Sequence, residues 1–207
     1  MKQSQAIAAV ILAAGASRRM GTPKALLLLN GETFLDRMIR LFAPLAQPVV
    51  VVLGHQAGEI RAGIKAANHA QLVVNPDPER GMLSSLQCGL AAIPSETEAV
   101  MFTPVDHPDL RQATLETLLR CYGSSRPLLA VPEHEGKHGH PVLIARPLIG
   151  ELLALPPTAQ AADVIHRHRA DTIYVDVADP AVTTDIDDRP AYDELVARQS
   201  RREPFRL

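Results

Sequence analysis

AIAAVILAAGASRRMGTPK, residues 6–24, joins a short apolar run to a loop of small and basic residues. The apolar run, Ala6–Ala14, contains Val and Ile and stops at Gly15, which is typical of a strand buried on both faces of a parallel sheet. A secretory signal is the alternative, because Lys2 precedes the run and small residues follow it. We favour the strand, since alanines interrupt the run and Arg18-Arg19 follows it at once.

The loop after this predicted strand has the composition of a phosphate-binding loop. Gly15 and Gly21 allow the backbone to turn tightly and to approach a ligand closely. Donors and positive charge come from backbone amides and from three side chains, Ser17, Arg19 and Lys24. The loop is neither a Walker loop nor a dinucleotide fingerprint, because Gly-Lys-Ser/Thr and the spaced glycines are missing. We expect a nucleotide polyphosphate to bind here.

The composition suits one α/β domain with a full-sized core, since 46% of the 207 residues are hydrophobic. We expect residues 1–200 to form this domain and residues 201–207 to be a mobile basic tail. A net charge of −2 and 3% aromatic residues argue against a nucleic-acid partner, and no apolar segment is long enough for a membrane span. Cys88 and Cys121, without metal-binding spacing, favour a reducing compartment, the cytoplasm.

Apolar runs alternate with helical patterns along the rest of the chain. After Thr33, a capping residue, the spacing of apolar residues predicts a helix, and another helix is expected to stop at Gly123. Further strands are predicted over 49–53, 72–75, 99–103, 128–131 and 172–177, and further helices over 59–67, 147–155 and 191–199. This order indicates an α/β fold with a single doubly wound, mostly parallel sheet flanked by helices.

Ligands of open α/β sheets bind where the strands end, which makes the residues after each strand candidates. Gly54 follows one predicted strand, and we expect it to lie at the nucleotide pocket. His55, next to it, is interpreted as a loop residue. Gly81, Ser84 and Ser85 mark the amino terminus of a helix, where unpaired amides favour anions. Capping serines explain the same residues, and the spacing barely separates the two interpretations.

Two acidic turns follow later strands. Asp106 lies between Pro104 and Pro108, where a carboxylate can bind Mg²⁺ together with phosphate oxygens, although a turn aspartate is the simpler interpretation of the spacing. Asp185 and Asp187 flank Ile186, so an extended backbone places both carboxylates on one side. We expect one of the pair to join Asp106 on a metal.

Three histidines lie close together in the sequence EHEGKHGH, residues 133–140. His134, His138 and His140 resemble a zinc ligand set in their spacing. However, a glycine-broken polar segment between two apolar runs is typical of a hairpin exposed to solvent. We favour the hairpin.

The segment LAAGASRRMGTPK, residues 12–24, resembles the LAAGxSxRMGxxK signature of the MobA-like nucleotidyltransferases, in their molybdenum cofactor cytidylyltransferase branch. GMLSSL at 81–86 is similar to the family's GMSSSL, GHPV at 139–142 to its GHPV, and DID at 185–187 to the start of its DIDTPEDY. The resemblance runs from about Ala6 to Leu195. It departs at 157–163, where the family's GDxGAR segment is absent.

The resemblance implies a nucleotide-diphospho-sugar transferase-like fold and assigns roles to residues of this chain. Leu12, Ala13 and Ala14 join Gly15 as nucleotide-binding residues, and the LAAG sequence implies CTP. Gly81, Ser84 and Ser85 then lie beside the nucleotide, and Asp106 binds the metal. The residues implied to face the acceptor are Gly139, His140 and Pro141.

The expected activity is Mg²⁺-dependent transfer of a nucleoside monophosphate onto a phosphorylated acceptor, with Lys24, Arg19 and Asp106 as catalytic residues. The resemblance implies CTP and molybdopterin as substrates, with a molybdoenzyme or its chaperone as a candidate protein partner. A sugar or alcohol phosphate acceptor is one alternative. A nucleotide-binding module that delivers a cofactor without turnover is another.

Overall fold

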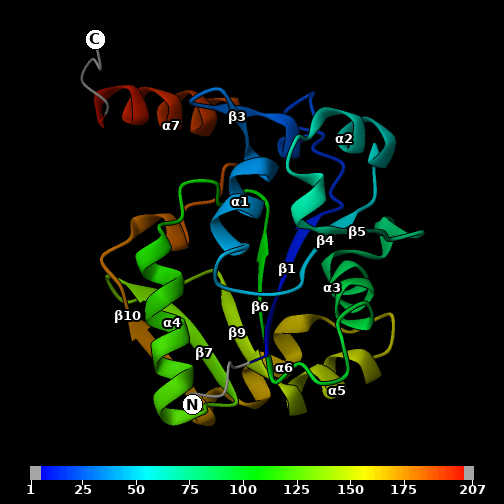
Figure 1. Ribbon diagram of the computed structural model, residues 1–207, viewed down its shortest axis with the longest axis vertical. Coiled ribbons are helices and arrows are strands. Elements are labelled where there is room, and N and C mark those ends of the chain that lie inside the picture. The colour runs from blue at the N-terminus through cyan, green and yellow to red at the C-terminus, as the bar shows by residue number, and fades with distance from the viewer. Residues whose placement is uncertain (1–5, 203–207) are drawn as a thin grey trace.

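The computed structural model describes residues 6–202, which form a central sheet flanked by helices (Figure 1). The sheet has the strand order β10-β7-β9-β6-β1-β4-β5, and β8 pairs with β7. The strand bounds are β1 Ile7–Ala13, β4 Val49–Leu53, β5 Gln71–Val74, β6 Ala99–Pro104, β7 Leu129–His134, β8 Lys137–His138, β9 Val142–Ala145 and β10 Thr172–Asp176. Because β9 alone on the main path runs antiparallel to its neighbours, the predicted mostly parallel sheet is confirmed.

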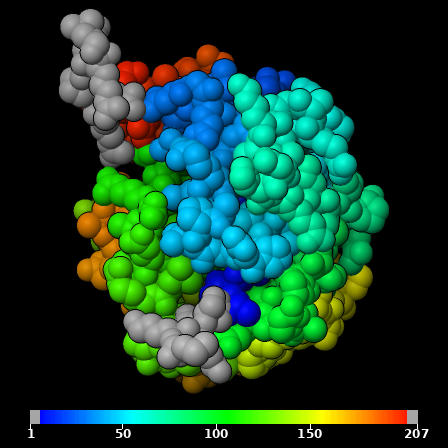
Figure 2. All heavy atoms as spheres, viewed as in Figure 1, coloured from blue at the N-terminus to red at the C-terminus, as the bar shows by residue number. Residues whose placement is uncertain are grey.

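Helices cover both faces of this sheet. Their bounds are α1 Phe34–Phe42, α2 Ala57–Gly63, α3 Met82–Ala91, α4 Gln112–Ser125, α5 Arg146–Ala154, α6 Ala161–Arg167 and α7 Arg189–Arg202. Within residues 6–202, five short 3₁₀ helices, η1–η5, lie at Lys24–Leu26, Ala67–His69, Pro78–Arg80, Arg169–Asp171 and Pro180–Thr183. Figure 2 shows the segments from blue to cyan, which include α1 and α2, packed into one continuous surface. Among the described helices, none combines the length and apolarity that a membrane span needs.

Strand β1 lies in the middle of the sheet and is buried on both faces, as predicted. Its alternate residues divide between two hydrophobic clusters: Ile11 packs with the cluster of α1 and α4, and Val10 packs with the cluster of α3, α5 and α6. The neighbours of β1 are β4 and β6, both parallel to it. The loops after β1 and β6 therefore leave the sheet side by side at one edge.

The first helix follows the prediction closely. The Thr33 hydroxyl accepts a hydrogen bond from the Asp36 amide at 3.0 Å, and the stripe Leu35, Met38, Ile39 and Phe42 is buried. Before it, a two-stranded hairpin, β2 Leu28–Leu29 and β3 Glu32–Thr33, turns at Asn30-Gly31, and both turn residues have positive φ.

The helix predicted over 59–67 is wrong at both ends. α2 begins earlier, at Ala57, and stops at Gly63, after which Ile64 is extended. The cause lies on another helix. The buried Asp36 carboxylate accepts hydrogen bonds from the amides of Lys65 and Ala66 at 2.8 and 2.7 Å, which takes both amides out of the helical pattern.

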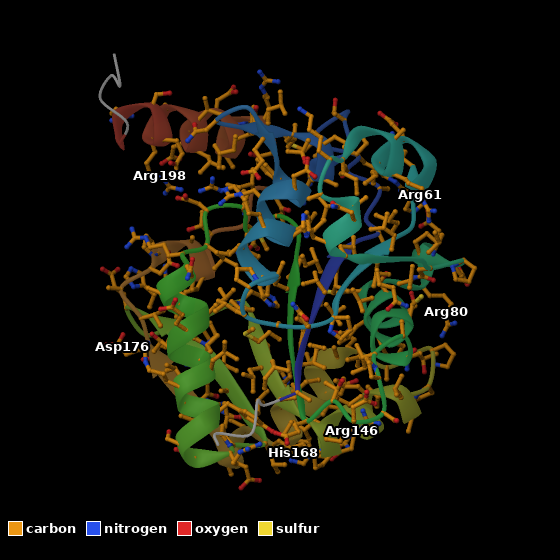
Figure 3. The ribbon with its side chains drawn as sticks, viewed as in Figure 1. Arg61, Arg80, Arg146, His168, Asp176 and Arg198 are labelled. Atoms are coloured by element: carbon orange, nitrogen blue, oxygen red, sulfur yellow. The ribbon has the colours of Figure 1, made fainter. Side chains whose placement is uncertain are left out.

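Two other helices extend beyond their predicted carboxyl ends. α4 continues through Gly123 to Ser125, and the left-handed residue that ends it is Arg126, whose guanidinium contacts Glu98 and the Tyr122 ring. α7 runs to Arg202 instead of stopping at Gln199, so the predicted mobile tail begins inside a helix. Arg198, labelled in Figure 3, bonds to Asp109 and fixes this helix to the chain after β6. The rest of the predicted tail, residues 203–207, lies outside the described residues.

The predicted histidine-rich hairpin is confirmed. β7 extends to His134, three residues beyond the predicted strand, and pairs with β8 in antiparallel register. The turn residues Glu135 and Gly136 have positive φ.

Candidate functional site

A cavity of about 280 Å³ lies where β1 and β6 end. Leu12 of β1 is in register with Pro104 of β6, so the loops that follow them form the two sides of this cavity. Its lining residues are Leu12, Ala13, Ala14, Gly15, Ser17, Arg18, Arg19, Pro23, Lys24, Ala25, Ile60, Met82, Ser85, Pro104, Val105, Asp106 and Asp187. The structure therefore brings together most of the residues that the sequence predicts for nucleotide and metal binding.

The loop after β1 is shaped by local hydrogen bonds. Ser17 adopts positive φ, and its carbonyl oxygen accepts from the Met20 amide at 2.9 Å. Its side-chain oxygen accepts from the Lys24 amide, also at 2.9 Å, which closes the loop and turns Lys24 toward the cavity. Gly21 has a φ of +67° and lies outside the lining, so its contribution is to the turn.

Lys24 joins the two acidic turns. Its Nζ lies 3.0 Å from Asp106 Oδ2 and 2.5 Å from Asp187 Oδ1, and its side chain is 14% exposed. Arg19 reaches Asp187 from the same loop, at 2.7 Å. The hydrogen bond from Lys24 is the largest cause that lowers the pKa of Asp187, and the bond from Arg19 adds to it. Asp187 is therefore ionised at neutral pH and faces two cations.

Asp106 has one carboxylate oxygen without a hydrogen-bond partner in the described structure. Oδ2 contacts Lys24, whereas the buried Oδ1 has no hydrogen-bond partner in the described structure. An orphaned, negatively charged oxygen of this kind fits a hard cation such as Mg²⁺. The described residues contain no group of three Asp, Glu, His or Cys side chains arranged to hold a metal, so a metal here would need phosphate or water oxygens besides the protein carboxylates.

The two aspartates of the second turn have different partners. Ile186 is buried between them, and its amide donates to the Asp106 carbonyl at 3.0 Å. Asp187 turns toward Lys24, whereas Asp185 Oδ1 lies 3.2 Å from Nε2 of His107. The structure thus brings Asp187 next to Asp106 and places Asp185 on the other side of His107, with its side chain 60% exposed.

The residues predicted to face an acceptor, Gly139, His140 and Pro141, lie outside the cavity lining. Gly139 packs on the backbone of Val182, where a Cβ would meet the carbonyl oxygen at 1.8 Å. The ring of His140 packs edge-on against Phe102 and beside His107. Contacts of these three residues with an acceptor remain a prediction.

His140 is expected to make the stability of the fold depend on pH. Burial, the largest cause, and the neighbouring His107 lower the pKa of His140 to about 4. The unfolded chain binds this proton more readily, so the free energy of unfolding is expected to fall as the pH drops through the range from 6.5 toward 4, by about 2 kcal/mol between pH 7 and pH 5. Urea unfolding of the wild type and of His140→Asn, in EDTA, measures it. Identical pH slopes for both proteins would contradict the prediction.

Three further residues of the nucleotide prediction, Gly54, Gly81 and Ser84, lie outside the cavity lining. Gly54 approaches Ala14 so closely that a Cβ would lie 2.8 Å from the Ala14 Cβ. Gly81, with a φ of +87°, precedes α3, and the buried Ser84 hydroxyl donates to its carbonyl at 2.8 Å. Ser85, one residue later, does line the cavity.

Sequence reasoning missed three residues at this site. Asn75, buried at the carboxyl end of β5, donates to the hydroxyls of Ser84 and Ser85 at 2.8 and 3.0 Å. Its position after a strand and before Pro76 was the available signal. Met82 lines the cavity with an exposed side chain, and His107 is buried beside the acidic turns. Neither has a sequence signal that separates it from an ordinary helix or turn residue.

Comparison with known proteins identifies the family. The model of the MobA-like NTP transferase domain matches residues 9–172. The molybdenum cofactor cytidylyltransferase of Escherichia coli (strain K12) is 25% identical over 182 residues, which cover 88% of this chain and 91% of that protein. A molybdenum cofactor guanylyltransferase of Sinorhizobium fredii is 36% identical over 102 residues, or 48% of this chain and 45% of that protein.

Two solved structures are similar to this chain over nearly its whole length. The Rv0371c homolog from Mycobacterium sp. strain JC1 has a TM-score of 0.82 at 29% identity, with 95% of this chain and 98% of that chain covered. Rv0371C of Mycobacterium tuberculosis in complex with manganese has a TM-score of 0.75 at 25% identity, with 94% and 99% covered. This chain belongs to the MobA-like NTP transferase family, and it is a nucleotidyltransferase related to the molybdenum cofactor cytidylyltransferases and guanylyltransferases.

Proposed function

We propose that residues 1–200 act as one domain that transfers CMP from CTP to molybdopterin and releases pyrophosphate, with Mg²⁺ as the cofactor. The observation that carries the proposal is the meeting of Lys24, Arg19, Asp106 and Asp187 at the loop after β1. Two cations of the loop after β1, Asp106 of the turn after β6, and Asp187 of the segment after η5 provide what a metal-bound triphosphate needs.

The proposed reaction needs no nucleophile from the protein. An oxygen of the acceptor phosphate attacks the α-phosphorus of the nucleotide, and the bond from that phosphorus to the pyrophosphate oxygen breaks. Lys24 and Arg19 neutralise phosphate charge and hold the triphosphate in line for the attack. Asp106 and Asp187 would hold Mg²⁺, which when bound supplies further charge neutralisation on the phosphates. The manganese complex of Rv0371C, a structural relative, supports a divalent metal in this fold.

Nucleotide choice is proposed from the end of β1. Ala14 gives the chain the LAAG sequence that its resemblance associates with cytidine nucleotides, and Ala14 lines the cavity. The E. coli relative is named a cytidylyltransferase, and the match covers 91% of its length, which supports the same nucleotide. Ser85, whose hydroxyl accepts a hydrogen bond from Asn75, also lines the cavity.

Fewer observations support the identity of the acceptor than the identity of the nucleotide. Molybdopterin is favoured by the names of the relatives and by the GHPV segment at 139–142. A sugar or alcohol phosphate is the second candidate, because 157–163 lacks the glycines and the arginine expected of a molybdopterin enzyme. We propose a cytoplasmic location, which the two free cysteines support.

Pyrophosphate release tests the proposal directly. The protein is incubated with each of CTP, GTP, ATP and UTP, with Mg²⁺, and with or without molybdopterin. Release that requires both CTP and molybdopterin is the expected result. Release with another pair of substrates would replace the acceptor or the nucleotide. A nucleotide that raises the melting temperature without any turnover would favour a delivery module instead.

The separation of Asp185 from Asp187 gives a specific prediction. Asp187→Asn is expected to weaken Mn²⁺ binding to the nucleotide-free protein at least tenfold, about 1.4 kcal/mol, because Asp187 lies next to Asp106. Asp185→Asn is expected to weaken it less, because Asp185 contacts His107 instead. Electron paramagnetic resonance of Mn²⁺ compares the two. Equal losses would place both aspartates on the metal.

A further inference from the structure

The two carboxylates proposed to hold the metal come from separate loops. Asp106 lies in the turn after β6, and Asp187 lies between η5 and α7. Neither residue is in a helix or a strand, so no regular pattern of backbone hydrogen bonds sets the distance between them. One backbone bond joins the loops directly, from the Ile186 amide to the Asp106 carbonyl. A metal bound by both side chains needs further cross-links that keep them aligned.

His107 makes one hydrogen bond and one close contact from the first loop to the segment that leads into Asp187. Its Nδ1–H donates to the carbonyl oxygen of Ala181 at 3.0 Å, since a carbonyl can only accept. Its Nε2 lies 3.2 Å from Asp185 Oδ1 and 3.8 Å from Asp106 Oδ1. The imidazole is 2% exposed, so its bond to Ala181 is shielded from water, whereas the Asp185 side chain is 60% exposed.

The ring of His107 is also held by its neighbours. His140 packs against it with ring centroids 5.2 Å apart. The His140 amide in turn donates to the Val182 carbonyl at 2.8 Å, one residue after Ala181. The imidazole therefore lies between both loops with little room for another rotamer.

We propose that His107 is the positioning residue that fixes Asp187 opposite Asp106 and keeps Asp185 away from the metal. Its bond to Ala181 anchors the start of the acidic segment, and its contact with Asp185 anchors that segment two residues before Asp187. Asp185 is then the partner of the histidine rather than a third metal ligand. The inference rests on the proposed metal-assisted transfer, and it names the side chain that aligns the two metal-binding turns.

Binding of Mn²⁺ to the nucleotide-free, full-length protein tests this role without any turnover. His107→Ala removes both ring contacts and is expected to raise the Kd for Mn²⁺ about 10- to 100-fold, as loss of a group that orients metal ligands does. His107→Asn keeps an amide donor near the position of Nδ1 and is expected to stay within about threefold of the wild type. His107→Gln places its amide near Nε2 instead, and its Kd is expected to fall between the two.

His134 provides the matched control. Its ring Nδ1 donates to the Val177 carbonyl at 2.8 Å, so it makes the same kind of bond from β7 to the chain after β10, away from the carboxylates. His134→Ala is expected to lower the melting temperature and to leave the Kd for Mn²⁺ unchanged. This control separates a general loss of stability from a loss of alignment.

Several results would overturn the positioning role of His107. An unchanged Kd in folded His107→Ala, or an equal loss in His134→Ala, overturns the positioning role. If His107→Ala does not fold, the Asn and Gln variants decide, and equal wild-type affinity in both overturns the role. A wild-type protein that binds no Mn²⁺ in either the absence or the presence of CTP overturns the metal site of the proposed function, and the inference with it.

Discussion

Lys24→Ala is expected to lower turnover at least about a hundredfold and, in the absence of nucleotide, to strengthen the binding of Mn²⁺. The loss of turnover follows from the loss of a charge-assisted contact to the phosphates, which costs about 3 kcal/mol in a transition state. The gain in metal affinity follows from where the ammonium lies. Lys24 Nζ bridges Asp106 Oδ2 and Asp187 Oδ1, the two carboxylates that a metal would share.

A cation that occupies the space between two carboxylates competes with any other cation for them. When a metal-bound triphosphate enters, its phosphates offer Lys24 a new anionic partner, so the lysine can leave the carboxylates without losing all of its pairing. Removing the lysine removes the competitor but also the phosphate contact. Opposite changes in metal affinity and in turnover are the expected result of this one substitution.

Pyrophosphate release and Mn²⁺ titration by electron paramagnetic resonance measure the two effects. Lys137→Ala is the control, because it removes one lysine from the exposed strand β8. Weaker Mn²⁺ binding by Lys24→Ala would show that the ammonium stabilises the carboxylates for the metal rather than competing with it. Normal turnover would remove Lys24 from the reaction.

The fold could be predicted from the sequence wherever one element carries its own signal. The run from Ile7 to Ala13 alternates between two buried faces, and the structure packs its two sets of residues into two separate clusters. Thr33 caps its helix as its residue type indicates. Such signals depend on neighbours a few residues apart, which the sequence displays directly.

The site could be predicted only in part, because its contacts join distant segments. Positions after strands predicted Gly15, Lys24 and Asp106 as site residues, because the loops at the carboxyl edge of a parallel sheet lie close together. The bridge from Lys24 to Asp106 joins residues 82 apart, and it depends on the strand order, which places β6 beside β1. The bridge from Lys24 to Asp187 joins residues 163 apart, and it depends on the bond from the Ile186 amide to the Asp106 carbonyl. A sequence does not display such pairings.

The predicted ends of two helices are wrong for the same reason. Asp36 ends α2 by bonding the amides of Lys65 and Ala66 from a different helix. Arg126, paired with Glu98, ends α4 three residues beyond the glycine that the sequence offers as a stop. A buried carboxylate or a distant ion pair thus overrides the local preference of a glycine or of a helical pattern.

Asp106→Asn is expected to abolish most turnover, by about a hundredfold to a thousandfold, while the fold remains intact. Asparagine has nearly the same shape, and the turn is held by its backbone, with the Val105 amide bonded to the Leu12 carbonyl and the Ile186 amide to the Asp106 carbonyl. What the substitution removes is charge. The side chain no longer carries the negative charge that Oδ1 and Oδ2 of Asp106 place beside Lys24, and a metal loses one of two protein carboxylates.

The dependence of turnover on Mg²⁺ distinguishes the loss of a metal ligand from a general loss of activity. If Asp106 binds the metal, the apparent affinity for Mg²⁺ falls and added Mg²⁺ restores part of the turnover, whereas added nucleotide alone does not. Asp193→Asn is the matched control, because Asp193 pairs only with Arg189 among the described residues and lies exposed on α7. Near-normal turnover in both Asp106→Asn and Lys24→Ala would refute the whole assignment, since each variant removes a group that the proposed reaction uses to neutralise or orient the triphosphate.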